Sequence, residues 1–146
     1  MKNLSGNSVS RVWVVENRIL KRQPKYLTDN EWYALHTFQE RGIVPQAIRL
    51  SDDIISMELI VEDTSFDAET FLANCEKFLL ILRIAGIRHG DLTRPHIFVV
   101  NSSPVVIDWA ESRIFSDPRP DKRREGDRHW MNVTAEQIVQ EMSNRG

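Results

Sequence analysis

HGDLTRPH, residues 89–96, is the stretch of this sequence that decides the fold. It is followed by an apolar β-hairpin pattern over residues 97–107, and an aspartate, Asp108, comes directly after it. Because a hairpin brings its two ends close together, we expect Asp91, His96 and Asp108 to converge on one face. The sequence therefore predicts a site that combines two carboxylates and an imidazole.

These three side chains suit phosphoryl transfer. Two groups able to hold a metal ion lie beside a carboxylate able to orient a hydroxyl, and in this reaction the protein contributes mainly positioning and charge neutralisation. Plainer interpretations stay open: Asp91 as a turn aspartate and His96 as a hydrogen-bonded structural histidine. A purely structural interpretation fits Asp108 less well, because an acid at the end of an apolar strand is costly to bury without a partner or a metal. We expect His89 to be structural and to brace the loop through a hydrogen bond.

The first half of the chain predicts a small sheet with one helix. A hairpin turn fits at Glu16-Asn17, between two β-branched and aliphatic segments. Residues 28–31, Thr-Asp-Asn-Glu, have the form of a capping box, and the helical stripe behind them ends at Gly42. The predicted strands are residues 12–15, 18–21, 47–50 and 54–60.

The second half predicts two helices. Residues 68–84 carry apolar side chains at helical spacing and end at Gly86. Residues 116–127 are rich in Pro, Arg and Asp without apolar periodicity, which predicts an exposed loop, and a last helix is expected over about residues 128–142. Strands first and helices later indicate an α+β protein. The side chains expected in the core are Trp32, Phe71, Leu72, Cys75, Phe78, Leu79, Leu82, Trp130, Val133, Ile138 and Val139.

Length, composition and charge limit the class of protein. The chain has 146 residues, 41% hydrophobic and 27% charged, which suits one folded domain and argues against wholesale disorder. Its 19 basic and 21 acidic side chains give a net charge of -2, which removes the usual electrostatic case for a general nucleic-acid binder. The single cysteine excludes an internal disulfide, and no apolar run approaches the ~20 residues of a membrane span. We therefore expect a cytoplasmic protein without a membrane segment.

The order of these motifs resembles the protein-kinase-like superfamily. The resemblance is to its small divergent branches: aminoglycoside phosphotransferases, RIO kinases, the small kinase of the KEOPS tRNA-modification complex and lipopolysaccharide kinases. Their catalytic loop reads His-x-Asp, then four residues, then usually Asn, and a second aspartate follows after a strand pair. The resemblance implies that Asp91 is the catalytic aspartate that accepts or orients the substrate hydroxyl. It also implies that His96 stands in the metal-binding Asn position and that Asp108 holds Mg²⁺ between the phosphates.

The upstream half is similar to the same families in the same order. Lys21, at the end of a strand, corresponds to the lysine that contacts the ATP phosphates. Glu31 corresponds to its ion-pair partner, although the capping box alone also explains this residue. Residues 56–60, SMELI, correspond to the gatekeeper and hinge strand, where backbone groups of Glu58 and Ile60 would hydrogen-bond adenine. The resemblance thus implies ATP and Mg²⁺ as ligands.

The sequence also departs from the kinase pattern. No Gly-x-Gly-x-x-Gly run precedes Val12, and the nearest candidate, residues 5–8, carries one glycine, which predicts a loose or absent phosphate cover. His96 replaces Asn, and imidazole is a poor Mg²⁺ ligand because hard cations prefer oxygen, although lipopolysaccharide kinases also have histidine here. Trp109-Ala110 replaces Phe-Gly, which argues against a mobile activation segment, and much of the usual helical lobe is missing. Asp127 corresponds to the structural aspartate that ties down the catalytic loop.

The sequence therefore predicts a minimal kinase-like domain of the α+β class. Residues 1–62 would form a small antiparallel sheet with one helix, and residues 63–146 a truncated helical lobe. The expected activity is ATP- and Mg²⁺-dependent phosphoryl transfer to a hydroxyl of a protein or small molecule. The rival hypotheses are a pseudokinase that serves as a nucleotide-binding or scaffold module, and ATP hydrolysis by a subunit of a larger complex. For the basic residues Arg113, Arg119, Arg123 and Arg124, a solvated loop and a docking surface for substrate or partner both stay open.

Overall fold

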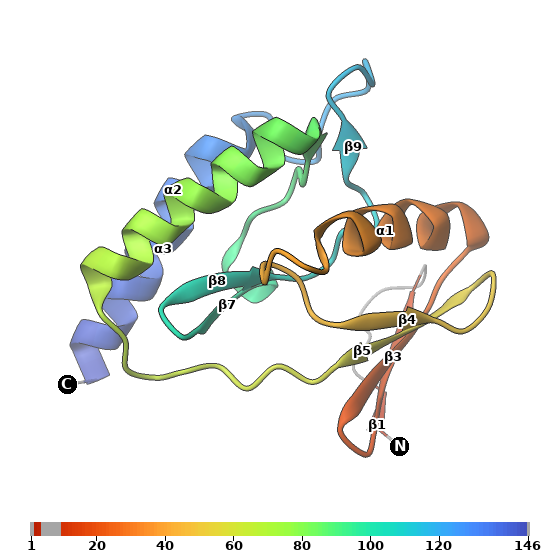
Figure 1. Cartoon of the computed structure of the whole chain (residues 1–146), viewed down its shortest axis with the longest axis horizontal. Helices are drawn as coiled ribbons and strands as arrows, with labels where there is room; N and C mark the ends of the chain where they lie inside the picture. The colour runs from red at the N-terminus through yellow and green to blue at the C-terminus, as the bar shows by residue number, and fades with distance from the viewer. Residues whose placement is uncertain (1, 4–9, 146) are drawn as a thin grey trace.

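The computed structural model describes residues 2–3 and 10–145, and the first part of the chain forms a five-stranded antiparallel sheet (Figure 1). The strand order is β1-β2-β3-β5-β4, so β3, which carries Lys21, lies at the centre of the sheet. The glycine-bearing candidate, residues 5–8, lies outside the described residues. The strands are β1 Lys2–Asn3, β2 Arg11–Val15, β3 Arg18–Arg22, β4 Ala47–Arg49 and β5 Ile54–Glu58. The four predicted strands are therefore confirmed within a few residues.

Helix α1, Lys25–Phe38, lies against β4 and β5. It begins directly after Pro24, a residue that suits a helix start because its φ is fixed and its missing N–H leaves no donor unpaired. The predicted capping box is wrong, because Thr28 lies inside the helix and its hydroxyl donates to the carbonyls of Gln23 and Pro24 at 3.1 and 3.2 Å. Glu31 therefore has no capping role and is fully buried.

Two long helices, α2 Ala68–Ala85 and α3 Gly126–Arg145, pack side by side in the second half (Figure 1). Asp67 caps α2 by accepting the backbone N–H of Thr70 at 3.0 Å. Gly86, with φ of 70°, ends the helix in the left-handed conformation that glycine adopts without strain. The predicted helix over residues 68–84 is thus confirmed.

The apolar faces of these helices differ from prediction at two positions. Leu72 and Val133 are 40% and 43% exposed, so their expected place in the core is wrong. In α3 the buried residues recur every three or four positions, which turns Val133 outward. The buried side chains of α3 are Met131, Thr134, Ala135 and Ile138.

A tight hairpin follows the 3₁₀ turn η1, Arg94–His96. Its strands are β7, Ile97–Val100, and β8, Ser103–Val106, and both turn residues between them have positive φ, as in the type I′ turns that match strand twist. Ile107 N–H donates to the carbonyl of His96 at 2.9 Å, which places the end of the hairpin beside its start. A second short pair joins β6, Ile87–Arg88, to β9, Arg113–Ile114.

One core joins the two halves. Trp109 is fully buried, and its ring centroid lies 5.3 Å from that of Phe38 on α1 and 6.2 Å from that of Phe78 on α2. Trp32 and Trp130 are only partly buried at the edge of this core, whereas Cys75 is buried as expected. None of the helices in the described part of the chain combines the length and apolarity that a membrane crossing requires.

Candidate active site

A buried ion pair links the sheet to α1. Lys21 Nζ lies 2.9 Å from Glu31 Oε1. Glu31 also accepts hydrogen bonds from Gln23 Nε2 at 2.8 Å and from the backbone N–H of Trp109 at 2.9 Å. Three donors thus compensate for burying this carboxylate, which would be costly alone. Burial lowers the pKa of Lys21, but the charges of Glu31 and then Asp108 outweigh it, so that the pKa is raised and the ammonium stays charged.

The same lysine reaches Asp108. Lys21 Nζ lies 3.2 Å from Asp108 Oδ1, and the Asp108 side chain is 43% exposed. Asp108 has φ of 63°, a left-handed conformation that aspartate tolerates better than most residues. Burial raises the pKa of Asp108, but the His96 hydrogen bond and the Lys21 charge outweigh it and hold the pKa well below its usual range. Asp108 is therefore a carboxylate that still faces solvent.

His96 bridges the two aspartates. Its Nε2 lies 3.1 Å from Asp108 Oδ2, and its Nδ1 lies 2.8 Å from the backbone carbonyl of Asp91 and 3.8 Å from Asp91 Oδ2. Both ring nitrogens face oxygen acceptors, an arrangement that favours the doubly protonated, cationic ring. Burial lowers the pKa of His96, but the hydrogen bonds to Asp108 and to the Asp91 carbonyl outweigh it and raise the pKa.

Whether a Mg²⁺ ion fits this site depends on the ligand chemistry of Asp108 and His96. The described residues contain no group of three or more His, Cys, Asp or Glu side chains placed to hold a metal. Mg²⁺ does not need such a cage, because it is usually bound by one or two carboxylates together with substrate phosphates and water. Asp108 fits that pattern with its exposed oxygens. His96 does not fit as arranged, since a doubly protonated imidazole offers no lone pair.

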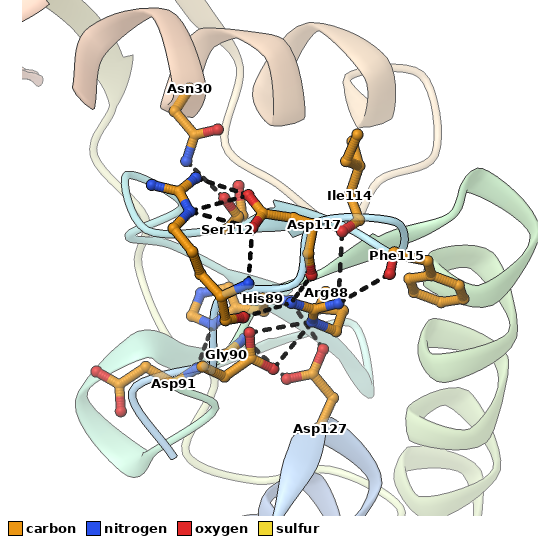
Figure 2. A network of polar contacts seen from close by, with 12 residues as sticks. Asn30, Arg88, His89, Gly90, Asp91, Ser112, Ile114, Phe115, Asp117 and Asp127 are labelled. Atoms are coloured by element: carbon orange, nitrogen blue, oxygen red, sulfur yellow. Dashed lines mark hydrogen bonds and ion pairs between the residues drawn. The ribbon is translucent and has the colours of Figure 1, made fainter. Parts of the chain in front are cut away.

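The loop that carries Asp91 is braced from behind by Asp127 (Figure 2). Asp127 accepts the backbone N–H groups of His89 and Gly90 at 2.7 and 2.9 Å. His89 is buried; its Nδ1 accepts the N–H of Asp91 at 3.1 Å, and its Nε2 therefore donates to the carbonyl of Ile107 at 2.9 Å. The geometry thus bears out the structural parts expected of His89 and Asp127.

Arg88, the residue before His89, anchors the loop that follows β9 (Figure 2). Its Nε donates to Asp121 at 3.0 Å, and its terminal nitrogens donate to the carbonyls of Phe115, Asp117 and Arg119 at 3.1 to 3.2 Å. Of the segment predicted to be an exposed loop, residues 116–125 form a loop that is anchored at several points, and residues 126–127 belong to α3. No sequence motif indicated the role of Arg88, because its partners are mostly backbone carbonyls.

The carboxylate of Asp91 is itself engaged. Arg123 Nε lies 2.9 Å from Asp91 Oδ1, and Lys122 Nζ lies 3.4 Å from Asp91 Oδ2. Burial raises the pKa of Asp91, but the Arg123 hydrogen bond, followed by the charges of His96 and Lys122, outweighs it and lowers the pKa. Sequence reasoning did not single out Lys122, and for Arg123 only the density of basic residues in the loop was a signal.

The predicted hinge residues, Glu58 and Ile60, lie at and just after the end of β5. Glu58 ends β5, and its N–H donates to the carbonyl of Gln46 at 2.9 Å. Ile60 lies two residues further, at the start of the segment that joins β5 to α2 (Figure 1). The structure therefore brings together Lys21, Glu31, Asp91, His96 and Asp108, and places Glu58 and Ile60 on the connection between the halves.

Known proteins match most of the length of this chain. Residues 14–127 match the family model described as the RIO domain. The Rio2 kinase from Chaetomium thermophilum has a similar structure, with a TM-score of 0.62 and 17% identity over 93% of this chain and 53% of that chain. The Rio2 kinase-ADP/Mg²⁺-phosphoaspartate complex from the same organism gives a TM-score of 0.58 and 19% identity over 99% of this chain and 55% of that chain.

The sequence identities and the coverage decide what these similarities show. At 17% and 19% identity they show the fold, and the chain spans about half of the length of the Rio2 kinase chains it resembles. No curated protein sequence matches the chain. The expected α+β class and kinase-like fold are confirmed.

Proposed function

This chain belongs to the RIO domain family, and from that premise we propose that it transfers the γ-phosphoryl group of Mg·ATP to a hydroxyl of a protein or small molecule. The observation that carries the proposal is the unbroken row of contacts from Glu31 through Lys21, Asp108 and His96 to Asp91. The contact between Lys21 and Asp108 joins residues 87 positions apart in the sequence. A row of this kind supplies the positioned cation and carboxylates on which phosphoryl transfer depends.

Each member of the row has a proposed part. Lys21, held by Glu31, binds phosphate oxygens of the nucleotide. Asp108 holds Mg²⁺, which when bound neutralises charge on the phosphates. His96 holds Asp108 and the Asp91 backbone in register, and it gains a place among the metal ligands only if it loses a proton.

Asp91 orients the acceptor. Its lowered pKa keeps it ionised, so one carboxylate oxygen accepts the hydrogen bond of the substrate hydroxyl. The hydroxyl oxygen then bonds to the γ-phosphorus while the bond to the β–γ bridging oxygen breaks, ADP leaves, and the hydroxyl proton passes to Asp91 or to water. A weakly basic aspartate suits this reaction, because the loose transition state needs orientation more than strong deprotonation.

The remaining assignments complete the proposal. The Glu58 carbonyl and the Ile60 N–H contact adenine, with residues 1–62 acting as the nucleotide lobe and residues 63–146 contributing to the acceptor lobe of one domain. A cytoplasmic location is proposed from the single, buried cysteine and the ATP requirement.

A second function has one observation in its favour. Both oxygens of Asp91 are engaged by cations, which suits a pseudokinase that binds nucleotide without transferring phosphate. ATP hydrolysis within a larger complex is the third alternative, and it needs the same residues with water as the acceptor.

Labelled ATP tests the proposal. Incubation of the protein with Mg²⁺ and γ-labelled ATP should place label in protein or an added hydroxyl compound, whereas a pseudokinase yields none and a hydrolase yields only labelled phosphate. Asp91→Asn should abolish transfer but keep nucleotide binding, and Asp108→Ala should weaken Mg·ATP binding. Asp52→Asn, on an exposed turn, is the control and should leave transfer and Mg·ATP binding unchanged. Unchanged Mg·ATP affinity in Asp108→Ala would overturn the metal assignment.

A further inference from the structure

Two cations from outside the catalytic loop hold its carboxylate. Arg123 and Lys122 contact different oxygens of Asp91, at 2.9 and 3.4 Å. The Asp91 side chain is only 12% exposed, whereas the side chains of Arg123 and Lys122 are 41% and 61% exposed. The cations therefore present positive charge to solvent directly beside a carboxylate that solvent barely reaches.

The segment that carries these cations is fixed in place. Arg123 N–H donates to the carbonyl of Gly90 at 3.2 Å, and its guanidinium lies 5.2 Å from the ring centroid of Trp130. Asp121 pairs with Arg88 and lies so close to Gly90 that a Cβ added there would stand 3.3 Å from Asp121 Cβ. The cations are thus positioned before any ligand arrives, which reduces the entropic cost of binding one.

Other cations near the row already have partners. Arg94, the arginine of the catalytic loop, is committed to two glutamates at 2.7 and 3.0 Å. Lys21 is separated from Asp91 by Asp108 and His96 in the row, and it is paired with two acids. An anionic group that approaches Asp91 from solvent therefore meets Lys122 and Arg123 first.

We propose that Lys122 and Arg123 form an oxyanion site that binds a phosphate or carboxylate group carried by the hydroxyl substrate. This inference rests on the proposed function and names its substrate class: a hydroxyl compound with an anionic group near the reacting oxygen. The anion replaces Asp91 as the partner of the two cations, and the freed carboxylate oxygens accept the hydroxyl. Arg123 supplies a planar fork suited to such groups, and Lys122 a mobile point charge.

Inorganic phosphate is the probe for the site, because it needs neither nucleotide nor catalysis. Titration of phosphate into the protein, followed by the Gly90 amide resonance in every variant and by the Arg123 Nε–H resonance where Arg123 is present, should show saturable binding. Lys122→Ala combined with Arg123→Ala should weaken it about tenfold or more, the effect of losing hydrogen bonds to a charged group. Lys122→Arg should retain it. Arg124→Ala, at an exposed neighbour with no ion-pair partner among the described residues, should leave it unchanged. Equal affinity in the double variant and the wild type would overturn the proposal.

A second measurement distinguishes an anionic group on the acceptor substrate from the γ-phosphate of ATP, which is the other source of an oxyanion. The double variant should bind Mg·ADP and a non-hydrolysable ATP analogue as tightly as the wild type does. A loss confined to the ATP analogue would overturn the assignment to the acceptor. The proposed function fails separately, because a wild-type protein that neither binds Mg·ATP nor transfers label refutes it whatever the phosphate titration shows.

Discussion

Glu31 accepts the backbone N–H of Trp109 at 2.9 Å, although the two residues are 78 positions apart. One oxygen of this carboxylate meets Lys21 and the other meets the residue that follows Asp108. Asn30, the neighbour of Glu31, adds hydrogen bonds from its side chain to the carbonyls of Ala110 and Ser112 at 2.6 Å. Helix α1 is therefore tied to the segment after β8 by buried polar contacts, and the phosphate-binding and metal-binding ends of the proposed site are fixed by one residue.

Removal of the Glu31 carboxylate should destabilise the whole fold. Glu31→Ala leaves Lys21 and the Trp109 N–H without their buried partner, and we expect a loss of about 3–5 kcal/mol in the free energy of unfolding, the range for breaking a buried pair. Urea denaturation measures this loss. Glu40→Ala, at an exposed position just after the same helix, should change stability by no more than about 0.5 kcal/mol. Equal effects of the two substitutions would show that the buried pair is not a stabilising feature.

The anchoring of residues 116–127 should depend on Arg88. Arg88→Lys keeps the charge but loses the planar fork that reaches Asp121 and several carbonyls together. Trypsin should then cleave at residues 122–124 several times faster, because the loop leaves its docked position more often. Arg83→Lys, on the exposed face of α2, is the matched control and should cleave like the wild type. An unchanged cleavage rate in Arg88→Lys would mean that other contacts hold the loop.

Buried His89 predicts a specific dependence of stability on pH. Burial lowers the pKa of His89 from its ordinary 6.5, so the unfolded chain takes up the proton more readily than the native protein does. Its contribution to stability is therefore complete above about pH 6.5 and falls as the pH drops below that value, with a slope of at most about 1.4 kcal/mol per pH unit. His96 acts in the opposite sense because its pKa is raised, and its contribution is lost as the pH rises.

The His89 contribution is isolated by difference. Free energies of unfolding for wild type and His89→Gln, measured in urea between pH 5 and pH 8, should converge as the pH falls, because the variant has no proton to gain. Thr37→Ala, at an exposed position of α1 without a titratable side chain, should instead run parallel to the wild type in this range. Parallel curves for His89→Gln would contradict a neutral buried imidazole.

Sequence patterns predicted the parts of the site that lie in local motifs. The convergence of Asp91, His96 and Asp108 followed from a hairpin that returns to its start, whereas Lys21 and Glu31 were implied by the resemblance to the kinase-like pattern. The error at residues 28–31 has a physical cause: hydroxyl and carboxylate at capping-box spacing also fit a helix interior, where Thr28 bonds to preceding carbonyls.

The sequence patterns did not predict the contacts between distant segments. The Trp109 N–H bond to Glu31 depends on how the two halves pack, and a backbone donor has no signature in the sequence. Arg123 and Lys122 lie in a segment without periodicity, so nothing in the spacing of residues 116–127 indicates which cations turn inward. Long-range packing decides both features, and a local pattern carries no information on it.

The substitution His96→Asn should lower the Mg²⁺ concentration needed for nucleotide binding. The native imidazole faces Asp108 and the Asp91 carbonyl with its two ring nitrogens, and its protonated form opposes a cation held by Asp108. Asparagine removes that charge and adds a carbonyl oxygen, the type of ligand that Mg²⁺ prefers. Titration of Mg²⁺ against the binding of a fluorescent ADP analogue should therefore give a midpoint several times lower in His96→Asn than in the wild type. His36→Asn, at an exposed position on α1, should leave the midpoint unchanged. An unchanged or higher midpoint in His96→Asn would mean that the histidine holds Asp108 in the geometry that Mg²⁺ requires and that its positioning outweighs its charge.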